Sequence, residues 1–394
     1  MKIHDIRRTF AENTETAITF GPNAAHAFAA RLKQRACRKL AVFTGSRSAA
    51  ASGALTAIQT AAADAGAAIS LFPGIPAEPD ILCVRQMAAF LQTAVPDTVA
   101  ALGGGSVMDA AKAAWIMHQS GRDAADFFGS NRSSEFFPGR HFDRILAIPT
   151  TSGTGSETTC YSNIVEPSAG VKKLISDPQI IPEAAFVDPA WSTTMPESVT
   201  RATGCDALAH LLEGFLNTGQ DDRHPAANRW ALTGIRLLTD WLPRAIATPT
   251  PEAREAVSAA AVLGGMVIRW KSTGLPHLCS FSWFGRIEHG IAAILLLPAA
   301  WRYYLGNPAV AARTMELSGI FPGRTPEEVI VSFRKFLDTC GVAADLSAYP
   351  AVTPELLECT AASAAENPMK LALAPRPVPL DEAAGVIRKI LQNR

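Results

Sequence analysis

Asp206 and His210 stand four residues apart in a stretch rich in alanine and leucine, and two further histidines, His277 and His289, follow in the same half of the chain. Side chains at positions i and i+4 project from one face of a helix, so a single helix could supply two ligands to a divalent metal. Imidazoles with one carboxylate suit Fe(II), Zn(II), Mn(II), Co(II) or Ni(II), because no thiolate selects a soft metal and no oxygen cage selects Ca²⁺ or Mg²⁺. The alternative is an ordinary surface pair. The apolar neighbours favour a buried pair, which needs an ion or each other.

Three consecutive glycines, Gly103 to Gly105, follow a β-type run and precede a helical run that starts near Ser106. Glycines let a backbone approach an anion, and the N–H groups and dipole of the following helix stabilise its charge. Ser106 would add a hydroxyl donor. Neither the Gly-x-Gly-x-x-Gly fingerprint nor the Walker sequence applies, so a turn without a ligand is the alternative.

A second loop, Pro149 to Glu157, also follows a predicted strand and combines two glycines with several hydroxyl side chains, including Thr150, Thr151 and Thr154. Open α/β sheets bind ligands at the carboxyl ends of their strands. Two polar loops at consecutive strand ends favour a bound nucleotide.

The first half of the chain alternates β-type runs with helical runs, which predicts a doubly wound α/β domain with helices on both faces of a mostly parallel sheet. The strand candidates are residues 40–44, 68–72, 98–102 and 144–148, and the helical candidates are residues 26–36, 49–63, 79–93 and 107–119.

From about Asp188 the β pattern fades and long helical stretches follow, so the second half is expected to be all-helical. The candidates are residues 197–216, 224–246, 251–268, 289–305, 326–340 and 380–391. We place an α/β domain at residues 1–187 and a helical domain at residues 188–394. The proline-rich residues 368–379 are expected to form an extended surface segment.

Composition favours a soluble globular protein whose partners are small molecules. Lys plus Arg equals Asp plus Glu at 36 each, so no charge excess attracts nucleic acid or an anionic membrane. No apolar run reaches the ~20 residues that span a bilayer, and the N-terminus does not resemble a secretory signal, so a cytoplasmic location is expected. The seven cysteines are scattered without a Cys-x-x-Cys pair and are expected to be reduced packing residues.

Several motifs occur here in the order seen in iron-containing (group III) alcohol dehydrogenases, which this sequence resembles over roughly residues 15 to 305. They are Gly103–Lys112, Pro149–Glu157, Asp188-Pro189, Thr203–His210, and His289-Gly290 with Leu297-Pro298. That family has a Rossmann-like N-terminal domain and a helical C-terminal domain, which is the dehydroquinate synthase-like architecture. The resemblance implies that residues 1–187 form a dinucleotide-binding domain and that residues 188–394 form a helical metal-binding, catalytic domain.

The resemblance implies roles for individual residues. Asp206, His210, His277 and His289 would be the catalytic metal ligands, with Fe(II) favoured and Zn(II) or another transition metal also compatible. The residues implied for the cofactor are Gly103, Gly104, Gly105, Ser106 and Asp109 on the pyrophosphate and nicotinamide side, with Thr150, Thr151, Thr154 and Lys172 lining the rest.

Cofactor choice depends on the residues after the second strand, which read Gly45, Ser46 and Arg47. An acidic side chain there would bind the ribose 2′-hydroxyl of NAD and repel a 2′-phosphate. With no carboxylate, and with Ser46 and Arg47 as donors, NADP(H) is favoured over NAD(H). The alternative is that Arg47 is only a solvated surface residue.

The sequence departs from the family pattern between the last two ligands. Family members often carry a histidine four residues after the third ligand, but this chain has Phe281 there, which leaves proton handling and substrate choice open. The interval from His277 to His289 is also about two residues shorter, and its bulky residues would narrow the site. Arg286 could pair with a carboxylate, phosphonate or sulfonate tail, or be an ordinary surface arginine.

The resemblance thus implies a metal-dependent NAD(P)(H) alcohol dehydrogenase or aldehyde reductase that acts on a small aldehyde or alcohol, with a homodimer expected. Glycerol dehydrogenase-like and dehydroquinate synthase-like members of the same superfamily are alternatives within this architecture. A nucleotide-binding redox sensor without catalysis is the alternative from another class.

Overall fold

The computed structural model describes residues 3–343 and 346–392. It divides into two compact units, Met1–Pro196 and Glu197–Arg394. The sequence pattern predicts a domain boundary near residue 187, and the functional assignment of the two domains remains a prediction.

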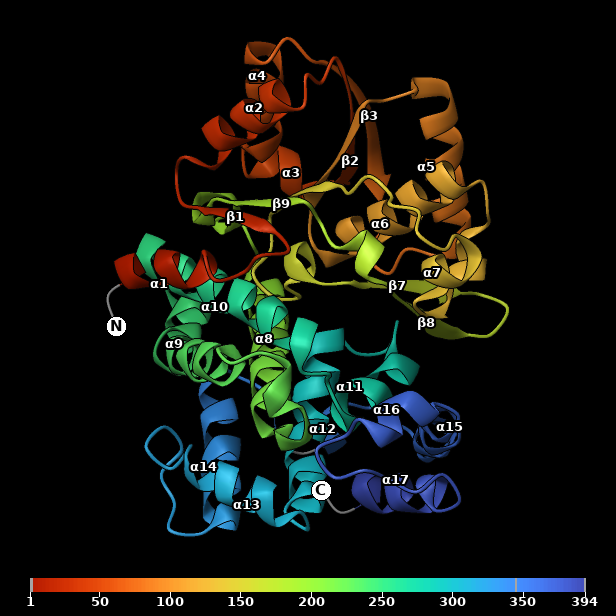
Figure 1. Ribbon diagram of the computed structural model, residues 1–394. Coiled ribbons are helices and arrows are strands. Elements are labelled where there is room, and N and C mark those ends of the chain that lie inside the picture. Colours follow the sequence, from red (N-terminus) through yellow and green to blue (C-terminus); the bar gives the residue numbers. More distant parts are fainter. Residues whose placement is uncertain (1–2, 344–345, 393–394) are drawn as a thin grey trace. The chain divides into compact units, whose positions relative to one another are not determined.

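The first unit is built on a six-stranded sheet in which every pairing is parallel (Figure 1). Its spatial order is β1 (Ala17–Phe20), β9 (Ala184–Val187), β6 (Leu146–Pro149), β4 (Thr98–Gly103), β2 (Lys39–Gly45) and β3 (Ala68–Ile75). The four predicted strands all belong to this sheet. The doubly wound α/β fold of the first half is therefore confirmed.

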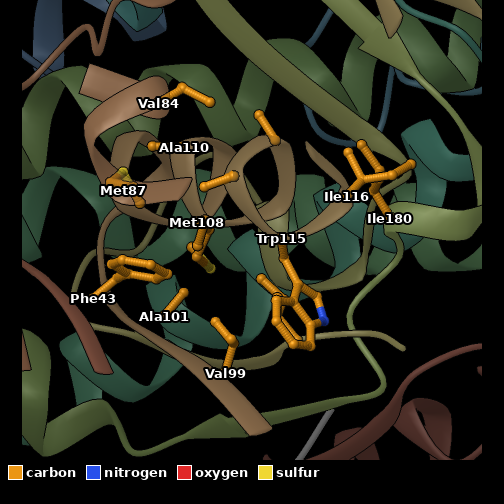
Figure 2. Close-up of a cluster of buried hydrophobic side chains, with 14 of the residues drawn as sticks. Phe43, Val84, Met87, Val99, Ala101, Met108, Ala110, Trp115, Ile116 and Ile180 are labelled. Atoms are coloured by element: carbon orange, nitrogen blue, oxygen red, sulfur yellow. The ribbon is translucent and has the colours of Figure 1, made fainter. Parts of the chain in front are cut away.

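Strand residues alternate between two buried cores, one on each face of the sheet. Phe43, Val99 and Ala101 pack on one face with α5 (Ile81–Ala94) and α6 (Gly105–Ser120), as Figure 2 shows for their contacts with Met108 and Trp115. The other face packs against α2 (Ala24–Gln34) and α4 (Ala54–Asp64). Burial on both faces explains the nearly continuous apolar runs of these strands.

The single helix predicted over residues 49–63 is wrong. The chain forms the short helix α3 (Ser48–Ala51) and then α4, separated by Gly53, whose φ of 76° is left-handed. A glycine in that conformation interrupts a right-handed helix at little steric cost. The pair Ser52-Gly53 therefore indicates a break between two helices, although the residues on both sides of it follow a helical pattern.

A three-stranded sheet, in the order β5-β8-β7, extends the first unit beyond the predicted elements. β5 (Gly129–Ser130) pairs with β8 (Val171–Ser176), which pairs antiparallel with β7 (Tyr161–Glu166). The short helices α1 (Ile3–Phe10) and α7 (Arg132–Phe136) complete the unit. The hairpin matters for the site because it packs beside α6.

In its described residues the second unit consists of helices and the loops between them, without a strand, as predicted. Its helices are α8 (Glu197–Leu216), α9 (Ala227–Ala247), α10 (Pro251–Trp270), α11 (Leu275–Ser280), α12 (His289–Tyr304), α13 (Pro308–Met315), α14 (Pro326–Thr339), α15 (Pro354–Ala365), α16 (Pro368–Ala372) and α17 (Ala383–Gln392). Every residue of α8 from Gly204 onward is buried. Gly204 and Gly214 permit this, because a Cβ at either would meet Leu242 or Val267 at 2.2 and 2.3 Å.

The extended surface segment predicted for residues 368–379 is wrong. α16 begins at Pro368, and Leu371 and Val378 are 0% and 4% exposed. Asn367 caps this helix, since its side chain accepts the N–H of Lys370 at 3.0 Å. The pair Asn367-Pro368 is typical of the start of a helix, whereas the prediction relied on the high proline content of the segment.

The seven cysteines are free thiols, and Cys359 is the exposed one. In the described part of the chain, each helix is too short or too polar to cross a bilayer.

Candidate functional site

Four side chains of the second unit converge on one oxygen atom. Asp206 and His210 lie one turn apart on α8, His277 lies in α11, and His289 is the first residue of α12. The Oδ1 atom of Asp206 is 3.9, 3.4 and 3.7 Å from the Nε2 atoms of His210, His277 and His289, respectively. One ligand atom each from Asp206, His210 and His277 lies within 4.8 Å of the others. The structure thus brings together all four residues that the sequence suggested as metal ligands.

The chemistry of this cluster fits a divalent cation. Among the described residues, Oδ1 of Asp206 and Nε2 of His277 are buried and have no hydrogen-bond partner. Buried polar atoms are rarely left unsatisfied in native proteins, and an ion can satisfy both. Burial opposes a charge on either side chain. Even so, His210 and His289 hold the pKa of Asp206 well below its usual range, and Glu213 with Asp206 raises the pKa of His277 to about 9. The site therefore attracts positive charge.

A glycine allows α12 to bring its first residue to the cluster. A Cβ at Gly290 would lie 2.0 Å from the carbonyl oxygen of Ala202 and 2.9 Å from the backbone nitrogen of Asp206. Any larger residue would push the start of α12 away from α8. In the His289-Gly290 pair, the glycine therefore allows α12 to approach α8 closely, and this approach places His289 beside Asp206.

Glu213 is a site residue that our sequence reasoning missed. It lies on α8 and is 0% exposed. Its Oε1 forms a hydrogen bond with Nδ1 of His277, and its Oε2 accepts the N–H of Gly274 at 2.6 Å. The sequence spacing does indicate this position for Glu213, because residues 206, 210 and 213 follow the i, i+4, i+7 spacing of a single helix face.

The segment between His277 and His289 is held by aromatic contacts. The ring of Phe281 stacks on that of His289, with centroids 5.9 Å apart and planes 13° apart. Trp283 is fully buried, and its Nε1 donates to Oγ1 of Thr360 at 2.9 Å, which ties the segment to α15. Phe284 is half-buried, and Arg286 is exposed. Phe281 therefore contacts His289 of the four-residue cluster, and Arg286 is accessible to solvent.

The three loops predicted to hold the cofactor lie at the carboxyl ends of neighbouring strands in the sheet of the first unit. They follow β2, β4 and β6, which are neighbours in the sheet, and comprise residues 45–47, 103–106 and 150–154. Thr150 connects them, since its N–H donates to the carbonyl of Gly103 at 3.0 Å and its Oγ1 donates to Oγ of Ser48 at 3.1 Å. Parallel strands end on the same side, so the loops form one surface.

The start of α6 has the features of an anion site. The helix begins at Gly105, and its N-cap, Gly104, provides no side-chain hydrogen bond. No side chain of the N-cap therefore accepts from the first N–H groups of α6, and the helix dipole favours a negative acceptor there. A Cβ at Gly105 would lie 2.6 Å from Cγ2 of Thr154, so glycine is also what lets the two loops pack together.

The other predicted cofactor residues connect α6 to the hairpin. Ser106 Oγ accepts the N–H of Glu78 at 3.3 Å, and Glu78 also forms an ion pair with Lys172. Asp109 accepts from Oγ of Ser156 at 2.6 Å and from the N–H of Asn163 at 2.9 Å. These side chains lie beside the loops, and each already has a structural partner.

Lys112 is the last residue of the motif Gly103–Lys112, and the sequence pattern predicts no role for it. It is 1% exposed. Its Nζ lies 2.7 to 3.3 Å from five oxygens of Ser156, Thr159 and Tyr161. This buried ammonium fixes the polypeptide that connects β6 to β7, which carries Thr150, Thr151 and Thr154.

Glu157→Gln is expected to flatten the pH dependence of stability. Glu157 is 3% exposed, and burial raises its pKa from 4.5 to about 7, although Lys112 acts in the opposite direction. The folded chain therefore holds this proton more tightly than the unfolded chain. Below pH 4.5 the carboxyl is protonated in both states, so its burial does not make stability depend on pH. Between pH 4.5 and 7 the unfolded chain releases the proton and the folded chain keeps it, so the free energy of unfolding falls by up to about 1.4 kcal/mol per pH unit.

Urea unfolding midpoints between pH 5 and 8 measure this effect. An Asp64→Asn variant, which changes an exposed carboxyl of the same unit, should keep the wild-type profile. Parallel profiles for the wild type and the Glu157→Gln variant would contradict the prediction.

Comparison with known proteins gives matches over almost the whole chain. Residues 15–189 match the family model described as iron-containing alcohol dehydrogenase, and residues 200–391 match the C-terminal model of the Fe-containing alcohol dehydrogenase family. An alcohol dehydrogenase of Thermococcus barophilus is 30% identical over 282 residues, which are 71% of this chain and 73% of that protein. The NAD-dependent methanol dehydrogenase of Bacillus methanolicus is 28% identical over 337 residues, or 83% and 86% of the two chains.

Solved structures agree with these matches. The iron-containing alcohol dehydrogenase from Thermococcus thioreducens is 25% identical, with a TM-score of 0.84 over 96% of this chain and 99% of that one. The chain also matches longer aldehyde-alcohol dehydrogenases, of whose length it spans about a third.

Proposed function

The chain belongs to the iron-containing alcohol dehydrogenase family. We propose that it catalyses the metal-dependent reduction of an aldehyde by NADPH and, in the opposite direction, the oxidation of the alcohol. The observation that carries this proposal is the convergence of three histidines on Oδ1 of Asp206. A homodimer in the cytoplasm is part of the same proposal.

Asp206, His210, His277 and His289 would hold the metal, and the start of α6 with Ser106 would hold the cofactor diphosphate. When bound, the metal would act as a Lewis acid on the substrate oxygen, and the reduced nicotinamide would supply the hydride. Phe281 offers no exchangeable proton. The proton that converts the oxygen to a hydroxyl must therefore come from elsewhere, such as a water molecule or a ribose hydroxyl.

The screen that tests the proposal combines metal analysis with NADPH oxidation against short aldehydes. We expect about one equivalent of transition metal per chain and turnover that is lost on chelation and restored by the metal. Turnover that survives complete removal of the metal would rule out the mechanism, and failure to reduce any aldehyde would rule out the activity.

Aldehydes with an anionic tail are the proposed substrate class. Arg286 is exposed on the segment between two of the proposed ligands. Lys370, a buried residue of the same unit, donates to Oγ1 of Thr273 at 2.8 Å. Burial is the main cause that lowers the pKa of His210, and the positive charge of Lys370 acts in the same direction. The screen should therefore pair each neutral aldehyde with one of the same length that ends in a carboxylate. A consistent preference for the neutral member would contradict this part of the proposal.

Arg47→Gln is expected to lower kcat/KM for NADPH about 10- to 100-fold, because a hydrogen bond to a charged group contributes about 1.5–3 kcal/mol. Arg47 is exposed and lies two residues after the end of β2, where a 2′-phosphate would lie. The value for NADH should change little. Steady-state kinetics with both cofactors measure the difference.

Arg38 provides a matched control, since it is an exposed arginine next to the opposite end of β2. Arg38→Gln should leave both values near those of the wild type. Equal losses with NADPH and NADH in the Arg47 variant would show that Arg47 does not read the 2′-phosphate.

A further inference from the structure

Glu213 joins the proposed metal cluster to the start of α11. It lies three residues after His210 on α8 and is fully buried. One carboxylate oxygen binds the Nδ1 atom of His277, and the other accepts the N–H of Gly274. Given the proposed metal-dependent function, we propose that Glu213 is a positioning residue, which orients His277 and supplies a second buried negative charge beside the cation.

Orientation follows from the chemistry of imidazole. A neutral ring carries one N–H, and a carboxylate at Nδ1 requires that N–H to be there, which leaves the lone pair on Nε2. Nε2 of His277 is the atom that faces Oδ1 of Asp206, at 3.4 Å. Glu213 therefore selects the tautomer and the ring position that present a ligand atom to the centre of the cluster.

The charge argument is independent of the orientation argument. Asp206 and Glu213 carry two negative charges in a buried site, 3% and 0% exposed, beside imidazoles that bind a metal in their neutral form. A divalent cation balances these charges, and the attraction is strong where water is excluded. Without the cation, His277, which contacts both carboxylates, can balance at most one of the two negative charges. Metal binding should therefore stabilise the wild type more than a variant without the Glu213 charge.

Glu213 also anchors α11, and this structural role must be separated from the proposed one. α11 has no side-chain cap of its own. Its first N–H groups are taken by other helices, since Gly274 donates to Glu213 and Leu275 donates to the hydroxyl of Tyr304 at 2.7 Å. Tyr304→Phe removes one anchor of α11 without removing the partner of His277, so it is a matched control.

The experiment is a Co²⁺ titration of the full-length protein after removal of its metal, in competition with a chelator. Glu213→Gln should bind Co²⁺ about 10- to 100-fold more weakly than the wild type, since partners of metal-ligating histidines usually contribute that much. Its visible Co²⁺ absorption spectrum should shift, and Co²⁺ should raise its Tm less. Tyr304→Phe should bind Co²⁺ with close to wild-type affinity and spectrum.

Wild-type affinity in Glu213→Gln, or an equal loss in Tyr304→Phe, would overturn the inference. If Glu213→Gln does not fold, Glu213→Asp replaces it. The aspartate keeps the charge but draws the carboxylate back from His277, so weaker Co²⁺ binding is expected, and unchanged binding would overturn the inference. A wild-type protein that binds no Co²⁺ would instead overturn the proposed metal-dependent function.

Discussion

His277→Ala is expected to abolish bound metal and turnover while leaving nucleotide binding largely intact. The variant loses the imidazole whose Nε2 lies 3.4 Å from Oδ1 of Asp206, and it leaves Glu213 without its histidine partner. Turnover should fall about a thousandfold or more, because a Lewis acid contributes several kcal/mol of transition-state stabilisation. Metal content per chain, steady-state NADPH oxidation and cofactor fluorescence measure the three quantities.

His26 offers a matched control, since it is an exposed histidine of the other unit. His26→Ala should keep its metal and its turnover. A His277→Ala protein that retains stoichiometric metal and wild-type activity would refute the assignment of His277. Loss of nucleotide binding together with the metal would instead indicate a general folding defect.

Gly290→Ala is expected to lose metal and stability together. The added Cβ would lie 2.0 Å from a backbone carbonyl of α8, and no side-chain rotation can relieve that contact. α12 must then shift and carry His289 away from Asp206. Overpacking of this kind typically costs about 1–3 kcal/mol, and the lost ligand weakens metal binding further. Thermal unfolding with and without added metal, together with metal analysis, measures both effects.

Gly385→Ala is the matched substitution, because Gly385 lies in a helix of the same unit and a Cβ there meets nothing within 4 Å. Alanine has the higher helix propensity, so this variant should be as stable as the wild type or slightly more so. A Gly290→Ala protein with wild-type Tm and metal content would show that α12 does not depend on this close approach.

Much of this fold could be predicted because long elements carry their own periodicity. Residues 197–216 form a helix with the bounds that the pattern predicts, and Asp206 and His210 follow from its spacing. Several short elements were not predicted in this way, although the four-residue strand β6 was. β1 and β9 have four residues each and α11 has six, too few for a pattern to rise above chance.

The role of Glu213 shows a different limit of sequence reasoning. Its spacing places it on the face of α8 that carries Asp206 and His210, but its partners come from α11, far away in the chain. Only the packing of α8 against α11 decides that a carboxylate on this face binds a histidine ring. The error at residues 368–379 had a simpler cause. Prolines suggested an extended segment, whereas Pro368 in fact begins a helix capped by Asn367.

The buried ammonium of Lys112 has a consequence for the thermodynamics of cofactor binding. Fixing a flexible backbone costs about 1–2 kcal/mol per residue, and a loop that became ordered only around its ligand would subtract that cost from the binding free energy. Here folding itself orders the connection between β6 and β7, because Lys112 gathers the oxygens of Ser156, Thr159 and Tyr161. The hydroxyl-rich loop is preorganised, so a nucleotide would meet a surface whose conformational entropy was already lost when the chain folded.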